Sequence, residues 1–372
     1  MGVSAARRIT SAVKSVLTDA HGRHEYAARM KWLLRGSGNL QAWSLEYRAG
    51  LTGRYAVEAN RTDLDPAHTM VCPADCPTGA PLSHLYEARY VYRLSDAIVN
   101  TTTGATLLAG TSEPPFFVRE SISWPFESIL SHGLDIPEMP NAEPAPTTPI
   151  TIFPSSPNYY HWLIEELPMF LRAHAAYPDV AVLAYSAGIT DRHRVTAQSL
   201  RVEIQPAPKT VRTRELILPG RANDSWFVHP RDADLLRDFG ARIAQPGLSS
   251  PDRIYVSRRN AARSLPFEHE LETLLEHAGF TIITPENYAW PEQLALFRGA
   301  RTVVAPHGAG LSNLVFTDRG ARVIELTNGY HYNRCFEWLS HLAGHHYLPI
   351  GVDDGTYQGA QDVADAIFNE VP

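Results

Sequence analysis

From about residue 150 onward, short apolar runs alternate with longer amphipathic stretches, and this alternation restricts the fold more than any other feature of the sequence. The apolar runs predict strands near 151 and at 180–185, 215–218, 253–257, 281–284, 301–305 and 322–327. Apolar residues spaced three or four apart predict helices at about 159–176, 190–200, 230–244, 267–278, 291–299, 309–316 and 333–343. Strands and helices in this order form parallel sheets with helices on both faces. The carboxyl ends of the strands then lie along one edge of each sheet.

Two polar breaks divide the 372 residues. The Pro-rich stretch 136–149 predicts an exposed connection, because proline excludes a helix or a central strand. The stretch QPGLSSPD at 245–252 precedes a new series of strands and helices. We therefore predict two α/β halves that meet near residue 248, with the cleft between them as the ligand site.

The predicted division has four segments. They are a partly helical extension with a basic start at 1–80, an N-terminal α/β domain on the acceptor side at 81–248, a C-terminal α/β domain at 249–345, and a tail at 346–372. We expect the tail to pack back on the N-terminal domain. Within 85–94 and 120–124, apolar and aromatic residues predict short strands, and little else before residue 136 gives a clear pattern.

Composition excludes several classes of protein. The 33 Lys and Arg residues against 40 Asp and Glu give a net charge of -7, which argues against a nucleic-acid partner. Cys72, Cys76 and Cys335 are too few for a disulfide framework, and the first two have no second pair to complete a zinc site. No apolar run approaches the roughly 20 residues that span a bilayer, and the start lacks a signal-peptide core. We predict a cytoplasmic protein.

The first 35 residues are basic, with seven Lys and Arg residues against two acidic residues. Ile9, Val13, Val16 and Leu17 fall at helical spacing. Such a helix either lies on an anionic membrane surface or packs on its own domain, and the pattern leaves both open. Peripheral membrane contact through the N-terminus is therefore one expectation.

The stretch RTVVAPHGAGLSN at 301–313 combines a predicted strand, a glycine-rich turn and a predicted helix from about Leu311. Gly308 and Gly310 let the backbone turn sharply and approach an anion without an intervening Cβ. Backbone N–H groups and a helix N-terminus at this edge suit a phosphate or diphosphate. Turns of this kind also occur simply to reverse the chain, so the stretch alone does not decide.

Charged residues follow two other strands of the second half. Arg258, Arg259 and Arg263 come directly after the strand at 253–257, where a guanidinium can bind a diphosphate through two hydrogen bonds. Glu325 lies at the end of the strand at 322–327, where a carboxylate can hold a ribose hydroxyl. Solvated surface charges are the alternative for each residue. Together with the glycine turn, these residues favour a nucleoside diphosphate.

A second cluster lies in NYYHWLIEELPMFLRAH at 158–174. On a helix starting near Tyr159, His161 and Glu165 are four residues apart and share a face. A histidine and a carboxylate paired in this way can act as an acid/base unit. The alternative is a histidine that only satisfies a hydrogen bond of the core. Metal binding has no third ligand in the pattern, so we predict no metal site.

These stretches, in this order and spacing, resemble the glycosyltransferases of family 61. The resemblance rests on NYYHWLIEELPMFL, RIYVSRRNAAR, HELETLLEHAGFTIITPE, PEQLALFRGARTVVAPHGAGLSNLVF and ARVIELT. It covers about residues 150–330 and none of the first 80. The family pattern H-W-x-x-[DE] falls on His161, Trp162 and Glu165, and its P-H-G-A-G pattern falls unchanged on 306–310. Many relatives have Asn-Glu after the arginines, whereas this chain has Phe267-Glu268, which leaves the role of that glutamate open.

The resemblance implies a GT-B fold of two Rossmann-type α/β domains facing a central cleft, a sugar-nucleotide donor and inversion at the anomeric carbon. It implies Glu165 as the first choice for the base, with His161 as its orienter or as the alternative base. The expected donor-binding residues are Arg258, Arg259, Arg263, His307, Gly308, Ala309, Gly310, Asn313 and Glu325. Fixed positive groups can stabilise the leaving diphosphate without a metal, so no cofactor and no metal are expected.

The expected function is an inverting glycosyltransferase that moves a sugar, most simply from a UDP-linked donor, to a glycan or lipid-linked glycan in the synthesis of surface polysaccharide such as capsule, or of a glycoconjugate. A polysaccharide pyruvyltransferase has a similar plan but uses phosphoenolpyruvate. A non-catalytic nucleotide-sugar-binding protein would keep the glycine turn without the base. A dinucleotide oxidoreductase is the weakest alternative, because the spacing G-x-G-x-x-G is absent.

Overall fold

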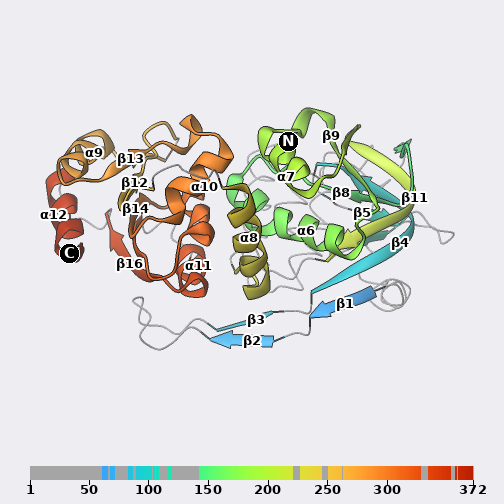
Figure 1. Ribbon diagram of the computed structural model, residues 1–372, viewed down its shortest axis with the longest axis horizontal. Coiled ribbons are helices and arrows are strands. Elements are labelled where there is room, and N and C mark those ends of the chain that lie inside the picture. The colour runs from blue at the N-terminus through green and yellow to red at the C-terminus, as the bar shows by residue number, and fades with distance from the viewer. Residues whose placement is uncertain are drawn as a thin grey trace, which may run out of the picture.

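The computed structural model describes residues 61–65, 68–71, 83–86, 89–102, 104, 106–108, 116–118, 142–220, 227–244, 250–261, 263–327, 334–352, 357 and 359–371. Two α/β bodies lie side by side along the long axis, each built on its own sheet (Figure 1). The basic stretch 1–35 and the pair Cys72 and Cys76 lie outside the described residues. No helix in the described part of the chain is long and apolar enough to span a bilayer.

The sheet of the first body has nine strands. In order they are β10 (Ile204–Ala207), β9 (Ala181–Tyr185), β8 (Ile150–Ile152), β11 (Thr210–Pro219), β4 (Arg89–Asn100), β5 (Thr106–Leu108) and β6 (Phe116–Val118), with β1 (Arg61–Asp65) beside β4 and β7 (Glu143–Pro144) beside β11. β2 (His68–Val71) and β3 (Ser83–Tyr86) form a separate antiparallel pair.

The first sheet is mixed, which corrects the expectation of parallel sheets throughout. β10, β9, β8 and β11 are parallel to one another, whereas β4 runs antiparallel to β11, paired from Val91–Pro219 to Asn100–Thr210. The connection between Asn100 and Thr106 is too short for a crossover helix, which needs a dozen or more residues, so β4 and β5 form a hairpin.

The sheet of the second body has five strands, and all of them are parallel. Their order is β13 (Thr281–Ile283), β12 (Arg253–Val256), β14 (Thr302–Pro306), β15 (Arg322–Thr327) and β16 (His346–Gly351). In chain order this arrangement is 2-1-3-4-5, so the direction of winding changes between β12 and β14. Ligands of open α/β sheets bind outside the carboxyl ends of the strands at such a point.

Helix α8 (Pro230–Ile243) lies between the two bodies (Figure 1). It contacts α6 (Leu167–Ala176) and α7 (Asp191–Leu200) of the first body. On its other side it contacts α10 (Trp290–Arg298), α11 (Cys335–Ala343) and the 3₁₀ helix η7 (Ala309–Phe316) of the second. A Cβ on Gly240 would lie 2.3 Å from the Phe316 ring, so glycine permits this close packing.

One apolar core continues from the first body to the second. It contains Trp162 and Phe170 from one side and Leu294, Leu311 and Phe316 from the other. The burial of this apolar surface stabilises one arrangement of the two bodies, and so fixes the carboxyl edge of one sheet relative to that of the other.

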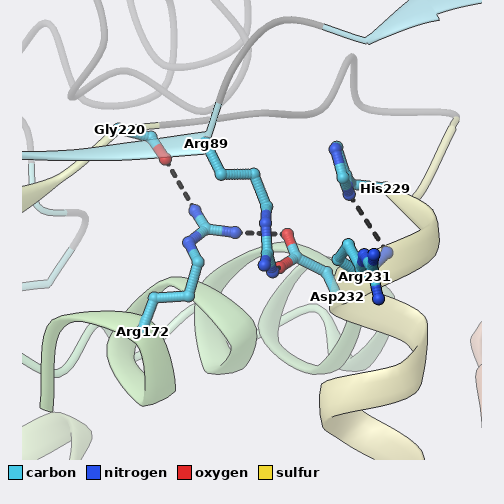
Figure 2. A network of polar contacts seen from close by, with 6 residues as sticks. All are labelled: Arg89, Arg172, Gly220, His229, Arg231 and Asp232. Atoms are coloured by element: carbon cyan, nitrogen blue, oxygen red, sulfur yellow. Dashed lines mark hydrogen bonds and ion pairs between the residues drawn. The ribbon is translucent and has the colours of Figure 1, made fainter. Parts of the chain in front are cut away.

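The start of α8 is fixed to the first body by a buried ion network (Figure 2). Asp232 is fully buried and accepts hydrogen bonds from Arg89 at 2.7 Å and from Arg172. Arg172 also donates to the Gly220 carbonyl at 2.7 Å. Burial alone would raise the pKa of Asp232, but the two guanidinium groups outweigh it and hold the pKa below its usual value. Asp232 is therefore ionised and joins β4, α6 and α8.

The C-terminal segment differs from the expected tail. β16 is the edge strand of the second sheet, and α12 (Ala360–Glu370) contacts α9 (Glu268–His277). Val363, Ala364 and Ile367 pack with Leu271 and Leu275 in the core of the second body. In the residues that the structure describes, the segment 346–372 thus belongs to the core of the second body, because the apolar face of α12 matches that of α9.

Two helices of the site have unusual hydrogen bonding. The predicted helix at 159–176 begins with the π-helical segment η4 (His161–Glu166) before α6 follows, and the predicted helix at 309–316 is the 3₁₀ helix η7. The short elements η5 (Ser186–Gly188) and η6 (Pro285–Asn287) are also 3₁₀ helices. π-Helical turns occur frequently at functional sites.

Candidate functional site

The glycine turn lies at the point where the second sheet changes its direction of winding. β14 ends at Pro306, and the backbone N–H groups of Gly308, Ala309 and Gly310 follow before the first turn of η7. Within the described residues these three groups have no hydrogen-bond acceptor. Free N–H donors at the carboxyl edge of a parallel sheet form a cradle for an anion.

Arg258 packs directly against the turn from the neighbouring strand. Its Nη1 donates to the His307 carbonyl, and a Cβ on Gly308 would lie 2.5 Å from that nitrogen. Burial lowers the pKa of Arg258, and the positive charge of Arg263 lowers it further, which places Arg263 close by. The structure thus brings Arg258 and the glycine turn together, with Arg263 near Arg258.

Glu268, whose role the family pattern left open, holds the loop that carries Arg258. Its Oε1 accepts from the Arg258 N–H at 2.5 Å and from the Tyr255 hydroxyl at 3.2 Å, and its Oε2 accepts from the Leu265 N–H at 3.1 Å. Burial raises the pKa of Glu268 in spite of these donors. Glu268 is 2% exposed, so its role is to fix the loop.

Arg259 points away from the turn, toward α9, where its Nη1 lies 3.0 Å from Glu272 Oε2. Both residues line a polar cavity of 220 Å³ beside the end of β13. Thr284, Asn287 and Tyr288 also line this cavity, and none of them was among the predicted site residues. Their signal in the sequence is only that they follow a strand of the second half.

His307 is fixed by a buried carboxylate. Its Nδ1 is bonded to Glu325 Oε1, and Glu325 Oε2 accepts from the Tyr347 hydroxyl at 2.6 Å. Glu325 is 0% exposed and both its oxygens are engaged. The structure therefore places Glu325 behind His307 and not at the predicted contact with a ribose.

The His161–Glu165 pair comes from the first body. His161 Nδ1 lies 2.8 Å from Glu165 Oε1 on the π-helical segment η4. The Glu165 side chain is 3% exposed and that of His161 is 22% exposed. The imidazole is therefore the group of this pair that a substrate can reach, and its Nε2 is the ring nitrogen not bonded to Glu165.

Aromatic residues connect the two His–Glu pairs. The Tyr160 ring lies 5.6 Å from the His161 ring and 5.7 Å from the Phe336 ring. Phe336 in turn lies 5.2 Å from the His307 ring. Both histidines thus lie along one line of packed rings that crosses from one body to the other.

Asn313 belongs to the contact between the bodies. It is fully buried, and its Oδ1 accepts from the Tyr159 hydroxyl at 2.6 Å. The same hydroxyl accepts from Trp290 Nε1 at 3.0 Å. These bonds replace the predicted contact of Asn313 with a donor, because the side chain is closed off by Tyr159.

Arg192 is a candidate that the sequence analysis missed. It is the second residue of α7, which follows β9, and its guanidinium carbon lies 4.5 Å from the centre of the Trp162 ring and 5.4 Å from that of Tyr159. The available signal was an arginine after a parallel strand of the first half, the feature that drew attention to Arg258 in the second.

His193 supports the first-body side of the site in its neutral form. It is 0% exposed, its Nδ1 accepts from the Thr190 N–H at 3.2 Å, and its Nε2 lies 3.1 Å from the Pro154 carbonyl. Burial lowers the pKa of His193 to about 4. A proton on Nδ1 would face the Thr190 N–H and disrupt the cap of α7.

We expect this histidine to make stability depend on pH. The unfolded chain takes up the proton near pH 6.5 and the folded chain only near the lowered pKa, so stability is lost as the pH falls from about 6.5 to about 4. The expected loss is about 3 kcal/mol. Urea unfolding at pH 7 and pH 4.5 measures it; His193→Gln should remove this part of the slope, and exposed His269→Gln should retain it. Equal slopes in all three proteins would contradict the assignment.

No group of three or more His, Cys, Asp or Glu side chains within the described ranges is arranged to hold a metal ion. Metal independence of the reaction remains a prediction.

One comparison with known proteins, that with family models, agrees with the family resemblance. The family model described as Glycosyltransferase 61 matches residues 159–324, a little under half of the chain. The matched segment contains the His161–Glu165 pair, the arginine loop and the glycine turn. The chain is therefore a glycosyltransferase. Its residues 159–324 belong to glycosyltransferase family 61.

One similar solved structure is a dodecameric iron-containing heptosyltransferase, TibC, in complex with ADP-D-β-D-heptose. The sequences are 10% identical, 80% of each chain is covered, and the TM-score is 0.30. A likeness at this score carries no argument about this chain. The comparison with curated proteins gives no match.

Proposed function

We propose that this protein is an inverting glycosyltransferase of the GT-B type that transfers a sugar from a nucleoside-diphosphate donor to a hydroxyl of a glycan or lipid-linked glycan. The observation that carries the proposal is the anion cradle at the winding change of the second sheet, formed by Arg258 and by three N–H groups that have no acceptor among the described residues. The first body then supplies the acceptor side. We place the reaction in the cytoplasm, in the synthesis of a surface polysaccharide such as capsule.

The exposure of the His161–Glu165 pair favours the histidine as the base. His161 Nε2 takes the proton of the acceptor hydroxyl, and Glu165 orients the ring and stabilises the charge that forms on it. The acceptor oxygen attacks the anomeric carbon, and the bond from that carbon to the diphosphate oxygen breaks on the opposite face with its electron pair. One displacement of this kind inverts the anomeric configuration.

The negative charge of the leaving diphosphate is stabilised by donor groups that are already in place. The N–H groups of 308–310 lie in the turn, the Arg258 guanidinium packs against it, and Arg263 lies near Arg258, all without a ligand present. Preorganised donors act without reorganisation at the moment of reaction. The cavity beside β13 supports a place for the nucleoside, because its Thr284, Asn287 and Tyr288 offer hydrogen bonds and a ring.

We expect UDP to stabilise the purified protein against heat, with or without EDTA. At a hundred times its dissociation constant, UDP should add about 2–3 kcal/mol to the free energy of unfolding. Arg258→Ala should abolish this shift, whereas Arg301→Ala, which changes an exposed arginine of the same body, should keep it. Thermal melting with a panel of nucleoside diphosphates and sugar nucleotides is the measurement.

The same panel separates the rival functions. Stabilisation by phosphoenolpyruvate in place of any nucleotide would support a pyruvyltransferase. Stabilisation by sugar nucleotides without release of nucleoside diphosphate from any of them would support a binding protein. No response of the folded protein to any nucleotide would overturn the proposal.

A further inference from the structure

The positively charged guanidinium of Arg192 lies at the carboxyl edge of the first sheet and contacts no carboxylate of the described residues. The residue is half-buried, and its guanidinium stacks on Trp162 and Tyr159. Within the described ranges, its side chain forms no hydrogen bond and no ion pair. Burial lowers the pKa of Arg192, because removal from water disfavours the charged form of the guanidinium.

Other arginines of the first body do have carboxylate partners, in contrast to Arg192. Arg194, two residues along the same helix, pairs with Asp191 at 2.5 Å, and buried Arg172 pairs with Asp232. Glu166 attracts Arg192 over a longer distance, but its Oε2 accepts from the Ser156 N–H at 2.9 Å. A guanidinium has five N–H donors, and a partly buried one is normally paired.

The position of Arg192 relates it to the reaction. Trp162, on which it stacks, directly follows His161 on η4. Tyr159, its second ring, bonds to Asn313, which lies three residues beyond Gly310. The two rings that Arg192 contacts therefore belong to the helix that carries the proposed base, and one of them is bonded to the 3₁₀ helix that follows the anion cradle.

We propose that Arg192 binds an oxyanion of the acceptor, a phosphate or a carboxylate. This inference rests on the proposed function, since it assigns the acceptor to the first body. The donor diphosphate has its own cationic side chains on the other sheet. We therefore assign Arg192 to a second negatively charged group. Stacking on the indole fixes the plane of the guanidinium and leaves its edges for two parallel N–H···O bonds. An acceptor with a phosphate-linked lipid or an acidic sugar meets this requirement.

Anion binding in four proteins tests the inference: wild type, Arg192→Gln, Arg192→Lys and Arg194→Gln. Inorganic phosphate, D-glucuronate and, as a neutral sugar, D-glucose are titrated by calorimetry into each protein with UDP present in excess. We expect phosphate or glucuronate to bind wild type and Arg194→Gln, and to bind Arg192→Gln about tenfold or more weakly. Arg192→Lys, which keeps the charge without the fork, should fall between. Preference for phosphate points to a phosphate-linked acceptor, and preference for glucuronate points to an acidic glycan.

Two results would overturn the inference: no binding of either anion to wild type, or binding that Arg192→Gln retains. If Arg192→Gln does not fold, the comparison rests on Arg192→Lys, and an affinity equal to wild type in that variant is equally decisive. The UDP titration alone reports on the proposed function. Normal binding of UDP to wild type, together with either of these two results, rejects only the role of Arg192, whereas absence of UDP binding in wild type rejects the donor site itself.

Discussion

Replacing His161 by alanine is expected to lower kcat/KM for sugar transfer by about 10³-fold and to leave the affinity for UDP unchanged. The imidazole is the accessible member of its pair, and removal of a general base costs about 10²–10⁴-fold in rate. In the proposed function the donor is bound by the second body, so its affinity should not depend on this side chain. The measurement is release of UDP from the sugar nucleotide that stabilises the protein, with binding followed separately by calorimetry.

Glu165 acts through His161 in this scheme, and its variant shows whether that is correct. Glu165→Gln should lower kcat by about 10²-fold with little change in KM, and the double variant should be no slower than His161→Ala alone. His174→Ala, on the following helix α6, should retain activity, because that ring stacks on Phe170. If Glu165→Gln is inactive while His161→Ala keeps most of its rate, Glu165 is the base, as the sequence first indicated.

Asp232→Ala is expected to lower the free energy of unfolding by about 3–5 kcal/mol. The substitution leaves the guanidinium groups of Arg89 and Arg172 buried with no opposing carboxylate from α8. It also detaches the start of the helix that contacts both bodies. Urea unfolding at pH 7 measures the loss.

A neighbouring aspartate provides the matched control for Asp232. Asp234 lies on the same helix, is 53% exposed and pairs with Arg237. Its substitution by alanine should change stability by less than about 1 kcal/mol, since exposed pairs contribute little. A similar small effect for Asp232→Ala would show that the network in Figure 2 does not hold α8. Because the pKa of Asp232 is lowered in the fold, its contribution should also vanish as the pH falls below about 4.

The sequence predicted the second body well because its pattern is local. Each strand from β12 to β15 is a short apolar run followed by a polar turn, so chain order alone places Arg258 and the glycine turn at one edge. The first body was predicted less well. β4 pairs with β11, which lies more than a hundred residues later in the chain, and only that pairing reveals its direction.

Residue types and spacing by themselves determined the α/β class, the two clusters with His161 and Gly308, and the family. Tertiary structure decided what each group does, because burial and partners come from segments distant in the chain. Glu325 is bonded to His307 and Tyr347 in place of the predicted ribose. Asn313 is bonded to Tyr159 in place of the predicted donor. Arg192 became a candidate only when the fold set it on two aromatic rings and gave it no carboxylate partner within the described residues.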